Sequence, residues 1–253
     1  MKIVIITGAS SGMGAEFARQ LDKELSCVEE FWLVARRKER LEELSEELTH
    51  PVRILAEDVR NQSFYEALER QLKECNADVK ILVNCAGYGI VGFAADREKE
   101  ELLGMVDVNC KALTAVTSLC LPYMRRNARI LQMASSAAYL PQPKFAVYAA
   151  TKSYVLNYSR ALSEELQPRE IYVTAICPGP VETEFFNKAE QYGASYGFKK
   201  YFMMDAECVV EEAIRASKQK QAVVTPSLAM KGFRVLVKVV PHEVILRIMR
   251  WMK

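Results

Sequence analysis

Short apolar runs alternate with longer, more polar stretches along most of this chain, and the alternation predicts the fold class. The apolar runs are rich in β-branched residues, which is typical of strands buried on both faces of a sheet. The stretches between them are interpreted as helices. Strands and helices that alternate in this way predict an α/β fold, a doubly wound parallel sheet of about seven strands with helices on both faces.

Each expected element can be placed on the sequence. Strands are expected at residues 2–7, 31–35, 52–56, 79–83, 129–133, 171–176 and 222–225. Helices are expected at residues 12–25, 38–48, 63–74, 96–127, 145–167 and 207–220. Because no repeat or low-complexity linker interrupts the pattern, residues 1–253 are interpreted as a single Rossmann-like domain.

The C-terminal residues 227–253 lie outside the alternation and differ from the rest in charge. They contain six basic residues and one acidic residue, a net charge of +5, interleaved with apolar side chains. Pro241 is expected to separate two short helices in this basic amphipathic extension. Such a segment suits a peripheral contact with an anionic membrane, a cover over the segment 182–206 or a contact with another subunit, and the three remain alternatives.

Composition narrows the class of protein. The formal net charge of only +2 predicts no binding of nucleic acid. Seven cysteines without a C-x-x-C pair favour reduced thiols in a cytoplasmic protein. The two histidines are far apart in sequence, so no metal site is expected. The chain begins directly with a strand and lacks about 18 consecutive uncharged apolar residues, so neither a signal peptide nor a spanning helix is expected.

A glycine-rich turn joins the first strand to the first helix, with the sequence TGASSGMG at residues 7–14. Three glycines let the backbone approach a pyrophosphate at the amino terminus of a helix. The spacing is G-x-x-x-G-x-G, a variant of the usual dinucleotide fingerprint. The candidate phosphate-binding residues are Gly8, Ser10, Ser11, Gly12, Met13 and Gly14.

The second strand ends in two arginines, Arg36 and Arg37, where a carboxylate would be expected to meet a free ribose hydroxyl. A guanidinium pairs with phosphate through a planar fork. The sequence therefore predicts NADP(H) in preference to NAD(H). In the alternative interpretation, the two arginines only begin a solvated helix.

Tyr148 and Lys152 lie four positions apart in an expected helix, at i and i+4, and so share a face of it. A nearby ammonium would lower the pKa of the phenol and suit it to proton transfer. The spacing alone is weak, because Tyr196 and Lys200 repeat it. The second pair lacks a serine upstream at the right spacing and is interpreted as part of a loop.

Taken together, these motifs resemble the short-chain dehydrogenase/reductase family over roughly residues 1–226. The other motifs that carry the resemblance are Asp58-Val59, Asn84-Cys85-Ala86-Gly87, Asn109, Ser135 and Pro178-Gly-Pro-Val-Glu-Thr183. Cys85 departs from the usual N-N-A-G pattern but removes no catalytic group.

The resemblance implies a role for each catalytic residue. Tyr148 would donate a proton to a carbonyl oxygen, and Lys152 would lower the pKa of Tyr148 and bind the nicotinamide ribose. Ser135, favoured over Ser136 by ungapped alignment, would hydrogen-bond the same oxygen. Asn109 would hold a water in a proton relay. Further cofactor contacts are implied for Asp58, Val59, Asn84, Ala86, Gly87, Pro178, Gly179, Val181 and Thr183.

The resemblance also implies a function. We expect an NADP(H)-dependent oxidoreductase, a carbonyl reductase that interconverts a small-molecule carbonyl and a secondary alcohol. The family's variable substrate lid corresponds to residues 182–206, whose many aromatic side chains favour an apolar substrate; Gly193 and Gly197 would let it move. A 3-oxoacyl-thioester reductase and a non-catalytic NADP-binding sensor are alternatives. Family members commonly form homodimers or homotetramers through the helices that carry Asn109 and Tyr148.

Overall fold

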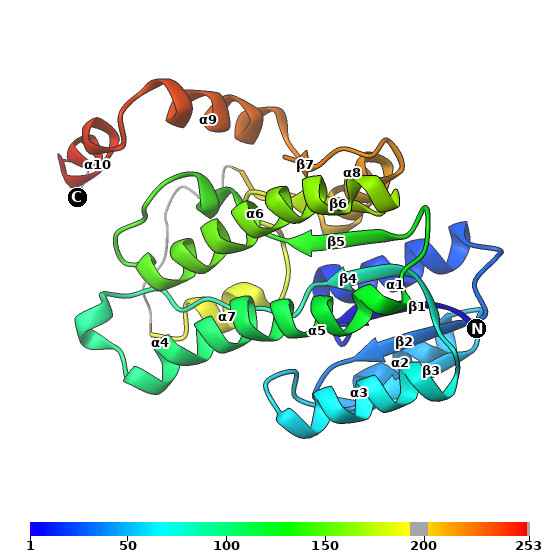
Figure 1. Cartoon of the computed structure of the whole chain (residues 1–253). Coiled ribbons are helices and arrows are strands. Elements are labelled where there is room, and N and C mark those ends of the chain that lie inside the picture. The colour runs from blue at the N-terminus through cyan, green and yellow to red at the C-terminus, as the bar shows by residue number, and fades with distance from the viewer. Residues whose placement is uncertain (193–201, 252–253) are drawn as a thin grey trace.

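A computed structural model describes residues 1–192 and 202–251, which contain one parallel sheet of seven strands (Figure 1). The strands are β1 Lys2–Thr7, β2 Glu30–Val34, β3 Val52–Leu55, β4 Asp78–Asn84, β5 Arg129–Met133, β6 Tyr172–Ile176 and β7 Val223–Val224. Their order across the sheet is β3-β2-β1-β4-β5-β6-β7. This order confirms the predicted fold class, and it reverses direction between β1 and β4, where such sheets bind ligands at the carboxyl ends of their strands.

Helices cover both faces of this sheet. They include α1 Gly12–Glu24, α2 Lys38–Glu47, α3 Gln62–Glu74, α4 Lys99–Val106, α5 Leu113–Cys120, α6 Ala146–Leu166, α7 Phe185–Ala189 and α8 Ala206–Lys218. Apolar side chains of α1, α2 and α8 pack with Val4 and Ile6 on one face. Those of α3, α5 and α6 pack with Ile3 and Ile5 on the other. Alternate residues of β1 thus enter opposite cores, as the apolar run predicts.

The expected helix 96–127 is shorter and interrupted. Asp96 closes a short 3₁₀ turn, Ala94–Asp96, and the extended backbone of Glu98 precedes α4. Between α4 and α5 the residues Asp107–Ala112 form a π-helical segment. The helix then ends in the 3₁₀ turn Leu121–Tyr123, which contains Pro122, because proline supplies no amide hydrogen to continue it.

The stretch Lys99–Tyr123 is, among the described residues, the one helix long and apolar enough to cross a membrane, with a mean hydropathy of 1.2. Met105, Leu113 and Val116 are nevertheless buried inside the protein. Part of the apolar character of this stretch therefore serves the core of the protein.

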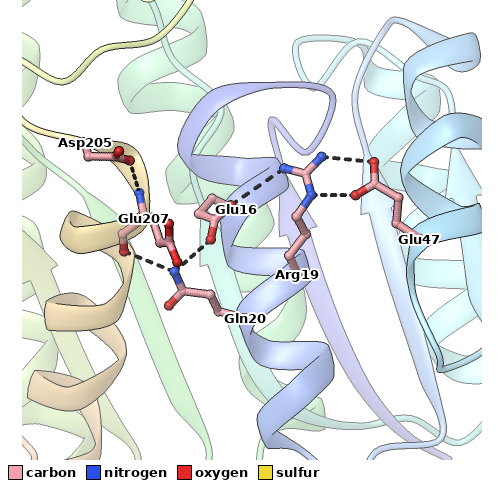
Figure 2. A network of polar contacts seen from close by, with 6 residues as sticks. All are labelled: Glu16, Arg19, Gln20, Glu47, Asp205 and Glu207. Atoms are coloured by element: carbon pink, nitrogen blue, oxygen red, sulfur yellow. Dashed lines mark hydrogen bonds and ion pairs between the residues drawn. The ribbon is translucent and has the colours of Figure 1, made fainter.

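The first helix, α1, is held by polar contacts to helices on both sides (Figure 2). The guanidinium of Arg19 on α1 donates to both carboxylate oxygens of Glu47 at the end of α2, at 2.6 and 3.1 Å. On the other side, the Gln20 amide donates to the carbonyl oxygen of Glu207 on α8, whose own amide is capped by Asp205. Exposed pairs of this kind add little to the stability of a fold.

The C-terminal extension forms two helices, α9 Leu228–Val239 and α10 His242–Trp251. They lie along one side of the molecule, beyond α6 and β7 (Figure 1). Val240 is extended and Pro241 follows it, which confirms that the proline separates two helices.

Candidate active site

The glycine-rich turn has the backbone geometry that a close approach requires. Gly8 and Gly12 have positive φ angles of 72° and 52°, which other residues rarely adopt. A Cβ atom on Gly14 would lie 2.2 Å from the carbonyl oxygen of Gly8. The turn therefore needs glycine at these positions to bring the carboxyl end of β1 against the start of α1.

The amino terminus of α1 is suited to an anion. The side chain of Ser11, which precedes the helix, makes no capping hydrogen bond, and the first turn holds no acidic residue. The helix dipole and its first N–H groups therefore favour a phosphate here. The turn borders a cleft of about 460 Å³.

Most predicted cofactor residues line this cleft. They are Gly8, Ser10, Ser11, Gly12, Met13, Gly14, Arg36, Arg37, Asp58, Val59, Ala86, Gly87 and Thr183. The structure thus brings together segments from the ends of β1, β2, β3 and β4 and from the loop after β6. A cleft of this shape, with a glycine cradle at one helix terminus, fits a dinucleotide.

Two arginine pairs occupy the far end of the cleft. Arg37 contacts the Oε2 atom of Glu184 at 2.8 Å, and its Nη2 donates to the Ser10 hydroxyl at 3.2 Å. Arg60 donates to both carboxylate oxygens of Asp58. In the described structure Arg36 lines the same cleft without an assigned ion pair.

These pairs change the electrostatics of the cleft. The hydrogen bond from Arg37 lowers the pKa of Glu184, and the one from Arg60 lowers the pKa of Asp58, so both carboxylates stay ionised.

The sequence interpretation missed Arg60, Glu184 and Lys188, all of which line the cleft. Arg60 could have been found from its position two residues after Asp58. The pairing of Glu184 with Arg37 depends on how the expected lid folds against the cleft, and no sequence motif indicated it.

A second cavity, of about 140 Å³, adjoins the cleft and is lined by three of the four predicted catalytic residues. Tyr148, near the start of α6, stacks on Phe145 with ring centroids 4.2 Å apart. Ser135 and Lys152 line the same space, as does Ser136. Pro178, Gly179 and Val181 form another wall. The cavity and the cleft share lining residues, so a group bound in one lies against a group bound in the other.

The hydroxyl of Tyr148 is buried beside that of Ser135. Burial raises the pKa of Tyr148, and the hydrogen bond with Ser135 partly opposes the rise. The prediction that Lys152 lowers this pKa is not met. The Nζ atom of Lys152 lies 5.6 Å from the Tyr148 ring centroid and donates to the carbonyl oxygen of Met133 at 2.6 Å. Tyr148 is therefore a protonated phenol at neutral pH. Ser135, rather than Ser136, is therefore the serine that acts on the pKa of Tyr148.

Lys152 is 4% exposed, and burial lowers its pKa to about 8. Its ammonium group is therefore still mostly protonated at neutral pH, but it loses its proton more readily than an exposed lysine does. A Cβ atom on Gly87 would lie 3.4 Å from its Nζ atom and 3.1 Å from the Oδ1 atom of Asn109. Lys152, Asn109 and the Asn84–Gly87 loop thus meet at one point.

The side chain of Asn109 is hydrogen-bonded to neighbouring residues of the protein. Its Oδ1 accepts from the amide of Tyr88 at 3.0 Å, and its Nδ2 donates to the Tyr88 carbonyl and to the Thr151 hydroxyl. Asn109 lies in the π-helical segment, a distortion often found at functional sites. In this structure the side chain therefore fixes the loop after β4. The role in a water relay stays a prediction.

Asn84 does not reach the cleft, contrary to the prediction that it contacts the cofactor. Its side chain is buried and donates to the Thr117 hydroxyl at 2.9 Å, because it points from the end of β4 toward α5. The rival pair Tyr196 and Lys200 lies outside the described residues, as do Gly193 and Gly197 of the expected lid.

Comparisons with known proteins agree with this geometry. A model of the short chain dehydrogenase family matches residues 2–193. Sulfoacetaldehyde reductase 2 of Chromohalobacter salexigens is 37% identical over 190 residues, covering 72% of this chain and 74% of the relative. A very-long-chain 3-oxoacyl-CoA reductase of Aspergillus terreus is 37% identical over 184 residues, covering 68% of this chain and 50% of the relative. A short-chain dehydrogenase from Sphingobium yanoikuyae, solved in complex with NADPH, superposes with a TM-score of 0.77 at 28% identity, covering 95% of this chain and 96% of that one.

Proposed function

Because the chain belongs to the short-chain dehydrogenase family, we propose that it is an NADP(H)-dependent oxidoreductase that interconverts an apolar carbonyl compound and a secondary alcohol. One observation carries the proposal. The side chains of Tyr148 and Ser135 line one cavity, and that cavity adjoins a dinucleotide-sized cleft. A carbonyl oxygen within reach of both hydroxyls would present its carbon to that cleft.

The side chains divide the chemistry as follows. The bound cofactor would supply a hydride, which is its own chemistry. Tyr148 holds the proton that the developing alkoxide needs, because burial keeps its phenol protonated. Ser135 donates a second hydrogen bond and orients the oxygen. Lys152, whose Nζ atom lies 5.6 Å from the centroid of the Tyr148 ring, would hold the nicotinamide ribose of the bound cofactor.

The preference for NADP(H) is supported by the far end of the cleft. Arg36 and Arg37 follow β2 there, and Arg37 already contacts the Ser10 hydroxyl at 3.2 Å. Two guanidiniums and a hydroxyl suit a 2′-phosphate, whereas a ribose with a free 2′-hydroxyl usually meets a carboxylate. A structurally similar protein was solved with NADPH.

An apolar substrate is supported by the walls of the catalytic cavity. Phe145, Phe185 and Phe186 line it together with Met13 and Met133. Among the described residues, Lys152 is the one basic residue that lines this cavity. Its Nζ atom already donates a hydrogen bond to the carbonyl oxygen of Met133. A sulfonate, as in the substrate named for one relative, would find no other cationic partner among the described residues that line this cavity. A hydrophobic ketone meets no such cost.

A 3-oxoacyl thioester is the second candidate substrate. The likeness to a very-long-chain 3-oxoacyl-CoA reductase favours it. An acyl chain would suit the aromatic walls of the cavity, while the carrier group would have to lie outside.

The substitution Tyr148→Phe tests the mechanism. We expect NADPH binding, followed by fluorescence titration, to persist, while turnover of the best substrate falls by at least about a thousandfold. Unchanged turnover would remove Tyr148 as the acid. Loss of binding together with turnover would indicate misfolding, which thermal unfolding distinguishes.

A panel of carbonyls tests the specificity. We expect ketones with large apolar groups to be reduced with a higher kcat/KM than small polar aldehydes such as sulfoacetaldehyde, and NADPH to be preferred to NADH. Turnover of 3-oxoacyl thioesters in the same panel tests the second candidate substrate. A non-catalytic sensor would bind NADPH and reduce none of these compounds.

We further propose a cytoplasmic location and a homodimer. All seven cysteines are free, which suits a reducing compartment. Leu103 and Val106 on α4 and Tyr154 on α6 are exposed, which supports pairing through this face.

A further inference from the structure

Exposed apolar side chains gather on the C-terminal extension. Six large ones are more than two-fifths exposed there: Leu228, Val235, Leu236, Val239, Val244 and Ile248. Leu228 and Val239 are the most exposed of them, at 85% and 76%. Scattered exposed leucines need no explanation, but a run of them along two consecutive helices indicates a contact surface.

The two faces of α9 are distinct. One face packs on the protein through Met230, Phe233, Arg234 and Val237, which follow the spacing i, i+3, i+4 and i+7. Arg234 lies over the ring of Tyr139, at 5.7 Å. The opposite face carries Leu228, Val235, Leu236 and Val239. This outer face is apolar although the inner face already anchors the helix, so the fold gives it no partner among the described residues.

Basic residues flank the outer face. On a helical wheel Lys231 and Lys238 lie together on one side of the apolar stripe, and both are exposed. Arg247 is exposed on α10, next to Ile248. Lys231 also contacts Glu212 of α8 at 3.0 Å, which ties the extension to the domain. The outer face is thus an apolar stripe with a basic border.

The charge of the extension opposes that of the rest of the chain. Residues 227–253 carry six basic residues and one acidic residue, whereas residues 1–226 carry 28 basic and 31 acidic, a net charge of −3. The excess of positive charge is therefore concentrated beside this exposed apolar stripe. Apolar groups bordered by lysine and arginine are the features by which helices bind at the surface of an anionic bilayer.

We propose that α9 and α10 form a docking surface for an anionic lipid membrane. Leu228, Val235, Leu236 and Val239 enter the interface, and Lys238 and Arg247 contact the lipid headgroups. A second copy of the chain fits less well. A two-fold contact through this surface would place one segment of net charge +5 against another.

The surface is close to the catalytic cavity. The cavity wall residue Gly179 lies against Met230 of α9, since a Cβ atom on Gly179 would be 3.0 Å from the Cγ atom of Met230. A protein docked through α9 would hold its active site near the bilayer, where apolar carbonyl compounds concentrate. Membrane docking itself does not depend on which compound the enzyme reduces.

Vesicle flotation of the full chain tests the proposal. We expect the protein to float with phosphatidylcholine–phosphatidylserine vesicles, to float weakly with phosphatidylcholine alone, and to be released by high salt. The double substitution Lys238→Glu and Arg247→Glu should weaken binding roughly tenfold or more, since each basic residue near the surface contributes severalfold. The triple substitution Leu228→Ser, Val235→Ser and Val239→Ser should weaken it as strongly. All five residues are exposed, so the variants should fold.

Two matched variants serve as controls. Arg70→Glu with Lys73→Glu makes the same charge change on the exposed face of α3, and Phe202→Ser with Met203→Ser removes exposed apolar groups elsewhere. Both should bind vesicles as the native protein does. The proposal is overturned if the native protein ignores anionic vesicles, or if either extension variant binds as well as its control. It is also overturned if the triple variant loses only a subunit contact, measured as a halved mass in solution.

Discussion

Glu184 and Arg37 form an ion pair at the far end of the cofactor cleft, where the proposed 2′-phosphate would bind. The carboxylate would compete with that phosphate for Arg37 and repel it. The substitution Glu184→Gln should therefore tighten NADPH binding. Both side chains are 44% exposed, so the pair contributes at most about 1 kcal/mol and the gain should be about two- to fivefold. NADH, which lacks the phosphate, should gain less.

Fluorescence titration with both cofactors measures this effect. Glu47→Gln is the matched control, because Glu47 also pairs with an exposed arginine, Arg19, but far from the cleft. Its cofactor affinities should not change. An equal gain for NADPH and NADH in Glu184→Gln would contradict competition with the 2′-phosphate.

Lys152 makes the stability of the cofactor-free protein depend on pH. Burial lowers its pKa from 10.5 to about 8, so between these values the unfolded chain binds a proton that the native protein lacks. Stability must then rise as the pH rises from about 8 to about 10.5. Lys152→Met should remove this rise and, at neutral pH, stabilise the protein by on the order of 1–3 kcal/mol while abolishing turnover.

Urea unfolding of both proteins at several pH values measures the difference. Other groups titrate in the same range, but they are common to both proteins and cancel. Lys73→Met, at an exposed position on α3, is the control and should show no pH-dependent difference. A stability difference between native protein and Lys152→Met that is constant with pH would mean that Lys152 is not perturbed by burial.

At the scale of elements, the turn into α1 and the helix α9 use glycine in opposite ways. Gly14→Ala would place a Cβ atom 2.2 Å from the Gly8 carbonyl oxygen, so the turn must distort. We expect a lower unfolding temperature and at least tenfold weaker NADPH binding. Gly232, inside α9, has nothing within 4 Å of such an atom. Gly232→Ala should therefore stabilise α9 by about 0.5–1 kcal/mol and leave binding unchanged. Thermal unfolding with NADPH titration checks both, and similar behaviour of the two variants would refute the steric argument.

The regular elements were predictable because their signals are local. The predicted strands 2–7 and 129–133 coincide with β1 and β5, and the bounds of the other strands differ by at most one residue at either end. The long helix 96–127 was predicted too long, because its π-helical segment and early end depend on packing around Asn109 and Pro122. The candidate catalytic residues were predicted from their motifs, and the structure brings Ser135, Tyr148 and Lys152 to one cavity. The motifs do not specify contacts between residues distant in sequence. Two such contacts are the hydrogen bonds of Lys152 with Met133 and of Asn84 with Thr117.

At the scale of the whole molecule, two exposed apolar surfaces compete for a role in self-association. One is the outer face of α4 and α6, with Leu103, Val106 and Tyr154 exposed by 53%, 41% and 43%. The hydroxyls of Tyr154 and Thr114 are 2.8 Å apart, which joins α6 to α5 and makes this face continuous. The other surface is the extension.

Light scattering after size exclusion separates the two. Leu103→Glu with Val106→Glu would place charges inside the proposed subunit contact, so the mass in solution should fall by half. Val235→Glu with Leu236→Glu makes the same change on α9 and should leave the mass unchanged, because that face is proposed to meet lipid. Both pairs are exposed, so neither variant should unfold. A mass halved by the α9 variant alone would assign self-association to the extension, and it would exclude both the α4–α6 contact and the membrane surface proposed here.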